Sequence, residues 1–271
     1  MYKEFYQLKE NPFNITADPD FFFCSTRHNE AFSHLTYGIN QRKGILVVTG
    51  EIGTGKTTLC RTLLNRLDQK TKTALILNPS FSDLQLLQII LKDLGIESHL
   101  KNKFALISAL NRFLIDQTSQ GHNVVLIIDE AQNLSIKQLE QIRLLSNLET
   151  EKEKLLQIIL VGQPELSEKL KLPNLRQLNQ RVTVRFHVLP LDRNEVKGYI
   201  HHRLSVASGP GKEPKVHFTD TAIDAIFEQS QGTPRVINIL CDRALLAGYL
   251  PGTFTINEEM VYNCAQEVVL R

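Results

Sequence analysis

A glycine-rich run between an apolar segment and a helical pattern constrains the fold of this chain more than any other feature. The run fits the pattern G-x-x-x-x-G-K-[ST] and reads Gly50-Glu51-Ile52-Gly53-Thr54-Gly55-Lys56-Thr57. Residues 45–49 before it predict a buried strand, and residues 58–67 after it predict a helix. Strand, glycine-rich turn and helix in this order indicate a loop that binds phosphate, whereas the glycines alone would indicate only a turn.

The chemistry of this loop favours a nucleotide that carries several phosphates. Glycines let backbone N–H groups curl around a phosphate, and the dipole of the following helix attracts negative charge. Lys56 is placed to reach the β- and γ-phosphates, and the hydroxyl of Thr57 can hold Mg²⁺. The predicted nucleotide-binding residues are Gly50, Glu51, Ile52, Gly53, Thr54, Gly55, Lys56, Thr57 and Thr58.

A second apolar run, at residues 124–128, ends in the two carboxylates Asp129 and Glu130. Ligands sit at the carboxyl ends of the strands in an open α/β sheet. Asp129 is therefore predicted to hold Mg²⁺, and Glu130 to orient or deprotonate an attacking water. The alternative is an acid pair beside the dipole of the next helix. The phosphate loop upstream favours hydrolysis of a nucleotide.

The remaining pattern predicts an α/β protein with a doubly wound parallel sheet. Continuous apolar runs predict four strands buried on both faces, at residues 45–49, 74–78, 124–129 and 155–161. Residues 182–188 alternate apolar and polar side chains, so we expect a fifth strand at a sheet edge. Helices separate these strands, and capping boxes are predicted at Ser82, Ser135, Asp192 and Thr255.

The chain becomes helical beyond Pro190. We therefore predict a nucleotide-binding α/β domain over residues 1–190 and a helical domain over residues 191–271. Lys plus Arg number 31 against 29 Asp plus Glu, a net charge of +2 that excludes a polybasic chain but leaves room for a local basic groove. No stretch approaches ~18 consecutive apolar residues and no apolar signal core begins the chain, so a cytoplasmic location without membrane insertion is predicted.

The sequence resembles the AAA+ ATPases over nearly its whole length and, more narrowly, the family of general secretion pathway protein A. The motifs that carry the resemblance, besides the phosphate loop, are Asn11-Pro12-Phe13, Ile128-Asp129-Glu130-Ala131-Gln132, Val161-Gly162-Gln163-Pro164-Glu165-Leu166 and Gly232-Thr233-Pro234-Arg235. The resemblance implies the P-loop NTPase fold of AAA+ proteins, with a C-terminal all-helical lid. It also implies ATP and Mg²⁺ as cofactors.

Further residue roles follow from the resemblance alone. Gln163 matches the sensor-1 position, where an amide can bond the γ-phosphate or the water, although a polar residue there can also merely start a helix. Arg235 matches the sensor-2 position in the lid. Arg181 is the expected arginine finger presented to a neighbouring subunit, with Arg176 and Arg185 as competitors.

The resemblance also implies a homo-oligomer, a ring or spiral that forms with nucleotide and couples ATP hydrolysis to assembly of a cell-envelope secretion machinery. Family members usually continue into a membrane segment, so we expect contact with the membrane through such a part or through a membrane-protein partner. The alternative is an ATP-dependent, DNA-binding regulator of transposition, because ATPases of that kind share much of these motifs. The small net charge does not favour DNA.

Two further stretches are expected to play no part in chemistry. The run His201-His202-Arg203 lies in a helical pattern and is interpreted as a solvated surface. The aromatic residues 21–23 are interpreted as core packing, and no contact with a nucleotide base is assigned to them.

Overall fold

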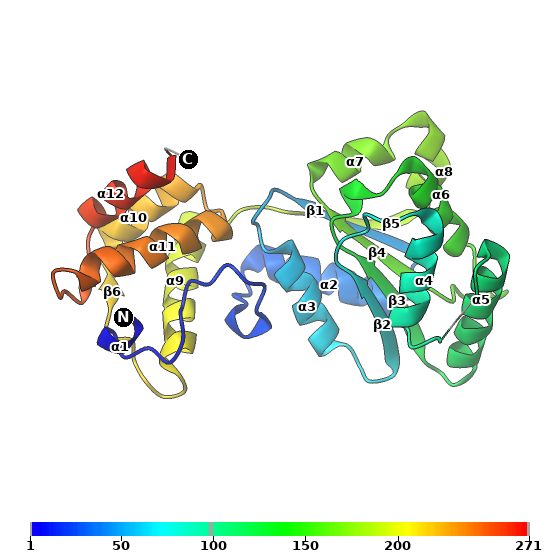
Figure 1. Ribbon diagram of the computed structural model, residues 1–271, viewed down its shortest axis with the longest axis horizontal. Helices are drawn as coiled ribbons and strands as arrows, with labels where there is room; N and C mark the ends of the chain where they lie inside the picture. Colours follow the sequence, from blue (N-terminus) through cyan, green and yellow to red (C-terminus); the bar gives the residue numbers. More distant parts are fainter. Residues whose placement is uncertain (1, 98–99, 270–271) are drawn as a thin grey trace. The chain divides into compact units, whose positions relative to one another are not determined.

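A computed structural model describes residues 2–97 and 100–269 of the chain (Figure 1). Its contacts divide the chain into two compact units, which are described separately. The sheet unit comprises Arg27–Ile52 and Leu59–Val188. The lid unit comprises Met1–Thr26, Gly53–Thr58 and Leu189–Arg271.

The sheet unit is built on a five-stranded, fully parallel sheet with the strand order β2-β3-β4-β1-β5. Its strands are β1 (Ile45–Gly50), β2 (Thr71–Ile76), β3 (Asn123–Ile128), β4 (Gln157–Gly162) and β5 (Val182–Val188). Every residue of β1 and β4 is buried, and so is every residue of β3 after the first. The prediction that the strand near residues 74–78 is buried on both faces is wrong, because β2 lies at a sheet edge and most of its residues are exposed or half-buried. Exposed and half-buried residues alternate along most of β5, which confirms the prediction of an edge strand. The predicted α/β fold with a parallel sheet is confirmed.

Helices connect the strands of the sheet unit and cover its faces (Figure 1). They are α2 (Thr26–Asn40), α3 (Lys56–Arg66), α4 (Asp83–Asp93), α5 (Lys103–Ser119), α6 (Ile136–Leu145), α7 (Pro164–Leu170) and α8 (Arg176–Asn179), with short 3-10 turns η2 (Ala131–Asn133) and η3 (Pro173–Leu175). The predicted capping boxes at Ser82 and Ser135 are present at the starts of α4 and α6. Leucine, isoleucine and valine side chains from the strands and from α4, α5 and α6 form one buried core.

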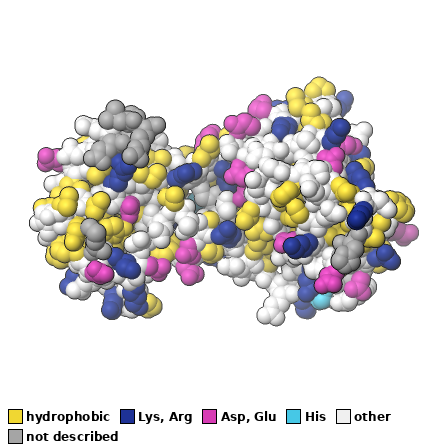
Figure 2. All heavy atoms as spheres, viewed as in Figure 1, with side chains coloured by type: hydrophobic (Ala, Val, Ile, Leu, Met, Phe, Trp, Pro, Cys, Tyr) yellow, Lys and Arg dark blue, Asp and Glu magenta, His cyan; other side chains and the backbone are white. Residues whose placement is uncertain are grey.

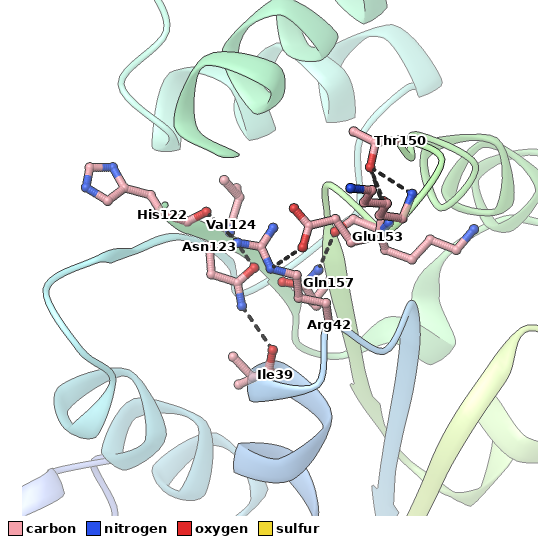
Figure 3. A network of polar contacts seen from close by, with 10 residues as sticks. Ile39, Arg42, His122, Asn123, Val124, Thr150, Glu153 and Gln157 are labelled. Carbon is pink, nitrogen blue, oxygen red and sulfur yellow. Dashed lines mark hydrogen bonds and ion pairs between the residues drawn. The ribbon is translucent and has the colours of Figure 1, made fainter. Parts of the chain in front are cut away.

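A polar network ties the amino-terminal end of the sheet to the end of α2 (Figure 3). Arg42 donates from Nη2 to the carbonyl of His122 at 3.1 Å, and its Nε lies 3.2 Å from a carboxylate oxygen of Glu153. Asn123 donates from Nδ2 to the carbonyl of Ile39 at 3.0 Å. These bonds fix the entry of the chain into β3 against the helix that precedes β1.

The lid unit contains α9 (Arg193–Ser208), α10 (Asp220–Ser230), α11 (Pro234–Tyr249) and α12 (Glu258–Val269). It is not all-helical as predicted, because β6 (His217–Phe218) and β7 (Thr255–Ile256) pair in parallel. The capping box at Asp192 is present, but Thr255 lies in β7 and does not cap α12. The side chain of Asn257 instead accepts a hydrogen bond from the N–H of Met260 at 3.1 Å.

The first 26 residues belong to the lid unit, which differs from the predicted domain of residues 1–190. They include α1 (Tyr2–Phe5) and the 3-10 turn η1 (Pro19–Phe21). Tyr6 is buried and donates to the carbonyl of Leu245 at 3.0 Å, while the ring of Phe5 stacks on Phe254 with centroids 4.7 Å apart. The aromatic side chains of this segment therefore complete the apolar core of the lid unit.

Arg203 holds the same segment in place, and its predicted position on a solvated surface is wrong. Its side chain is only 5% exposed and donates to the carbonyls of Pro12 and Asn14. Its guanidinium also bonds the hydroxyl of Tyr199 at 3.0 Å and lies over the ring of Phe21, 4.7 Å from its centroid. A cation can be buried here because carbonyl oxygens and aromatic faces replace its water.

No helix in the described part of the chain is both long enough and apolar enough to cross a bilayer.

Candidate nucleotide site

The predicted phosphate loop lies between the end of β1 at Gly50 and the start of α3 at Lys56. Gly53 and Gly55 adopt left-handed backbone angles, with φ of 81° and 91°, which glycine accepts without a steric penalty. Thr54 and Lys56 are buried, at 1% and 7% exposure. The local backbone thus turns sharply into the amino end of a helix, as an anion-binding loop requires.

The flanks of this loop are more open. Glu51 and Ile52 are exposed, and Thr57 and Thr58 are half-buried in the first turn of α3. The hydroxyl of Thr57 is an oxygen donor of the kind that Mg²⁺ prefers.

Within the lid unit, the loop contacts the helix that carries the predicted sensor-2 arginine. The backbone N–H of Arg235 donates to the carbonyl of Gly53 at 3.2 Å. A Cβ atom on Gly53 would lie 2.7 Å from the Cβ of Arg235 and 3.3 Å from Cγ2 of Thr233. Glycine at position 53 is therefore needed twice, for its backbone angle and for this close approach. The side chain of Arg235 is exposed in the first turn of α11.

The motif that begins α11 is itself fixed to the start of the lid. Gly232 has a φ of 71°, and its carbonyl accepts a hydrogen bond from the N–H of Leu191 at 2.9 Å. A Cβ on Gly232 would lie 1.9 Å from the carbonyl oxygen of Leu191, so no other residue fits. This contact fixes the start of α11, and with it the position of the Arg235 side chain.

The acidic pair lies at the carboxyl-terminal edge of the sheet. Ile128 of β3 pairs with Leu160 of β4, which pairs with Val47 of β1, so the three strands end at one edge. Asp129 is 2% exposed, and its N–H donates to the carbonyl of Ile76 at 2.8 Å. A buried carboxylate at this edge is also an oxygen donor suited to Mg²⁺.

Glu130 has a backbone conformation that is unusual for a residue with a side chain. Its φ of 51° and ψ of 37° lie in the left-handed region, and its N–H donates to Oδ1 of Asp129 at 2.9 Å. Strained backbone of this kind is found preferentially at functional sites. The turn directs the half-buried carboxylate of Glu130 toward the end of β4, where it meets Gln163.

Two amides bond the carboxylate of Glu130. Nε2 of Gln163 donates to Oε2 of Glu130 at 3.4 Å, and Nε2 of Gln132 donates to the same oxygen at 2.5 Å. The structure thus brings together the predicted water-orienting residue and the predicted sensor. Gln132 belongs to the motif of residues 128–132, but the sequence alone assigns it no role. A polar residue two positions after Glu130 was the only local signal that could have found it.

Arg181, the expected finger, lies at the opposite end of the sheet from the acidic pair. β5 runs parallel to β1, with Val182 beside Ile45 and Val188 beside Gly50, so Arg181 stands at the amino end of the sheet. The carboxyl end is about 20 Å away, given ~3.3 Å per strand residue. Arg181 therefore does not join the Glu130 cluster of its own sheet unit.

The other two candidates differ in exposure and in partners. Arg176 is exposed at the start of α8. Arg185 is exposed on β5 and donates to the carbonyl of Asn179 at 3.3 Å and to its side-chain oxygen. Arg181 is half-buried, and together with Lys154, which contributes more, it holds the pKa of Glu149 below its usual value.

Comparison with known proteins shows which proteins the chain resembles. Residues 39–170 match the family model described as "AAA domain". The chain is 43% identical over 272 aligned residues to general secretion pathway protein A of Aeromonas hydrophila, a match that covers 99% of this chain and 48% of that protein. The chain therefore spans about half the length of this relative.

Solved structures share the fold at low sequence identity. A Cdc6p structure from Pyrobaculum aerophilum matches with a TM-score of 0.67 and 17% identity, covering 92% of this chain and 70% of that one. The RuvB Holliday junction branch migration motor of Thermotoga maritima matches with a TM-score of 0.56 and 19% identity, covering 88% and 67%. At these identities the matches establish the P-loop fold alone.

Proposed function

Residues 39–170 form an AAA domain, and from this premise we propose that the chain binds ATP with Mg²⁺ and hydrolyses the bond between the β- and γ-phosphates. The observation that carries the proposal is the cluster at the carboxyl edge of the sheet. There the Glu130 carboxylate is held by the amides of Gln132 and Gln163, at the end of a strand that follows a phosphate loop in the sequence. Such a carboxylate is suited to orient an attacking water.

The phosphates are assigned to the loop and the metal to two oxygen donors. Backbone N–H groups of Gly50–Thr58 and the ammonium of Lys56 hold the phosphates, because glycines at 53 and 55 turn the backbone and the helix dipole attracts the charge. Thr57 and Asp129 would hold Mg²⁺. When bound, that ion neutralises negative charge on the phosphates.

Two residues sense the γ-phosphate in this proposal. Gln163 reports on the water and phosphate from the sheet unit, because its amide already reaches Glu130. Arg235 does so from the lid unit. Its backbone is bonded to Gly53, so the base of the arginine side chain is fixed beside the loop. A structural role for Arg235 alone is less favourable, because a cation opposes the dipole at a helix start.

Arg181 is proposed to act on the nucleotide of a neighbouring subunit. Its place at the amino end of β5, a strand length from the carboxyl edge, supports action in trans over action within its own sheet unit. This requires a homo-oligomer, a ring or spiral formed with ATP. Mixing Arg181→Ala subunits with Glu130→Gln subunits, which bind ATP and keep the finger, should restore activity. Mixtures as inactive as each variant alone would contradict the finger.

The proposed task is assembly of a cell-envelope secretion machinery, in contact with the membrane through a further part of the protein or a partner. The support is the extended match to general secretion pathway protein A of Aeromonas. Acidic and basic side chains are interspersed on the face of the sheet unit that Figure 2 shows, in keeping with the net charge of +2. Salt-dependent binding of duplex DNA stimulated by ATP would instead support a role in DNA transposition.

The central test separates binding from hydrolysis. Lys56→Ala should abolish ATP binding in a direct titration, because the cation that meets the phosphates is lost. Glu130→Gln should bind ATP as the wild type does and lose turnover. If both variants hydrolyse ATP at the wild-type rate, the proposed site is not the site of hydrolysis.

A further inference from the structure

We propose that Gln132 is a positioning residue that holds Glu130 and Gln163 in the arrangement required for ATP hydrolysis; the inference rests on the function proposed above. Both ends of its side-chain amide are in use. Nε2 donates to Oε2 of Glu130 at 2.5 Å, and Oε1 accepts from the backbone N–H of Gln163 at 3.1 Å. One side chain thus joins the end of β3 to the end of β4.

The fold leaves room for this amide at one particular glycine. A Cβ atom on Gly162, the last residue of β4, would lie 2.7 Å from Oε1 of Gln132. It would also lie 3.1 Å from Cδ2 of Leu166. Gly162 does not have a positive φ, so its backbone alone does not require glycine. The closest approach is to the amide of Gln132, which occupies the space where a side chain would begin and would have to move if one were added.

The turn that carries Gln132 is held from a second side. Lys169 of α7 donates from Nζ to the carbonyl of Gln132 and, at 3.0 Å, to the carbonyl of Leu134. Because α7 begins directly after Gln163, the helix that follows the sensor residue also fixes the η2 turn. The backbone and the side chain of Gln132 are therefore both bound to the sensor-1 segment.

This arrangement leaves one oxygen of Glu130 for chemistry. Oε2 accepts both amide hydrogen bonds, whereas Oε1 receives none from the residues that the structure describes. We assign the water to Oε1, with Oε2 as the fixed point about which the carboxylate is oriented. Without Gln132, the carboxylate keeps only the longer bond from Gln163, at 3.4 Å, and can rotate.

The test replaces the amide by an apolar side chain of similar length in the full chain. Gln132→Met should lower kcat for ATP about tenfold to a hundredfold through loss of orientation, with KM for ATP and the Kd for Mg-ADP unchanged. The matched control is Asn133→Ala, because Asn133 is exposed on the same turn and its side chain makes no hydrogen bond to a described residue. This control should keep the wild-type kcat.

A double-variant cycle distinguishes positioning from a general structural effect. If Gln132 acts through Glu130, Gln132→Met should lower the residual single-turnover rate of a Glu130→Gln protein little or not at all. An equal loss in both backgrounds, or a wild-type kcat for Gln132→Met, would overturn the inference. Should Gln132→Met fail to fold, Gln132→Glu takes its place, since it can accept from Gln163 but cannot donate to Glu130, and a wild-type kcat there overturns the inference equally.

The two proposals fail differently. Undiminished turnover in Glu130→Gln would refute the proposed function. Loss of turnover in Glu130→Gln with full turnover in Gln132→Met would refute only the positioning role.

Discussion

The two ends of the parallel sheet both carry polar clusters, but the clusters use different partners. At the amino end, the side chains of Arg42 and Asn123 donate mainly to backbone carbonyls, and Arg42 also pairs with Glu153 (Figure 3). A backbone carbonyl has no rotamer to change, so each bond there fixes the position of a chain segment. This cluster stabilises the fold.

At the carboxyl end, side chains bond to other side chains. Glu130 accepts from the amides of Gln132 and Gln163, and all three come from turns that follow strands. Such bonds fix the orientation of a reactive group while the group remains able to exchange partners. The comparison supports the proposal that polar side chains serve stability at one end of the sheet and chemistry at the other.

The largest expected effect comes from neutralising the carboxylate of Glu130. The same change at Glu153, at the other end of the sheet, is the control. Glu130→Gln should lower kcat by about 10²–10⁴, the usual contribution of a positioned general base, and should leave ATP binding intact. Glu153→Gln should leave kcat unchanged, since Glu153 pairs with Arg42 at the other end. Steady-state ATPase assays with parallel nucleotide titrations measure both. A large fall in kcat for Glu153→Gln would show that the cluster at the amino end also affects hydrolysis.

A second variant tests the stabilising role of the amino end. Arg42→Met removes the hydrogen bond to the His122 carbonyl and the ion pair to Glu153 while it keeps the aliphatic length. Because a hydrogen bond from a charged group contributes about 1.5–3 kcal/mol, the free energy of unfolding should fall by about 2 kcal/mol. Urea unfolding measures this loss. The kcat of the folded fraction should not change, and a catalytic defect without loss of stability would contradict the assignment.

Two glycines, one near each end of the sheet, test the same difference. A methyl group on Gly162 would lie 2.7 Å from Oε1 of Gln132, whereas one on Gly44 would come no closer than 3.9 Å to Lys154. Gly162→Ala should therefore displace the amide and lower kcat by about tenfold. Gly44→Ala should have the wild-type kcat. Equal rates for the two alanine variants would show that the space beside Gly162 is not needed for turnover.

The smallest expected effect is a pH dependence at the amino end. Lys154, and to a lesser degree Arg181, hold the pKa of Glu149 below its ordinary value. The folded state then binds the proton less tightly than the unfolded chain. This stabilisation is present above the unfolded pKa and is lost as pH falls through the folded pKa.

Glu149→Gln removes that dependence. The difference in urea midpoint between wild type and Glu149→Gln should favour the wild type near pH ~6 and shrink as the pH falls below ~4. A difference that stays constant over this range would show that the ion pair with Lys154 makes no pH-dependent contribution to the free energy of unfolding.

Local patterns were enough to predict most of the sheet unit. Unbroken apolar runs mark β1, β3 and β4 as strands buried on both faces, and the alternation over residues 182–188 marks β5 as an edge strand, because each pattern reports which faces of a strand are covered. The run at residues 74–78 was misleading, because β2 is the other edge strand and only two of its residues are buried. The phosphate loop and the acid pair could be placed for the same reason. The loop and the acid pair each follow directly after an apolar run, so the end of the run shows where the strand ends.

The sequence could not predict contacts between segments that are distant along the chain. Gln132 and Gln163 are joined only because β3 and β4 are neighbours in the sheet. The first 26 residues belong to the lid unit because their aromatic side chains fill its core, although the chain next enters the sheet unit. Arg203 appeared solvated because its partners are backbone carbonyls, which carry no signal in the sequence.

By itself, the sequence determined the parallel α/β fold, the turn suited to phosphate and the residues at the ends of the strands, since periodicity and backbone preference act over a few residues. Only the tertiary structure decided which of those ends meet, how Gln132 is shared between Glu130 and Gln163, and why Gly53 must lie against Arg235. These depend on shape and hydrogen-bond geometry across packed elements, which no local pattern specifies.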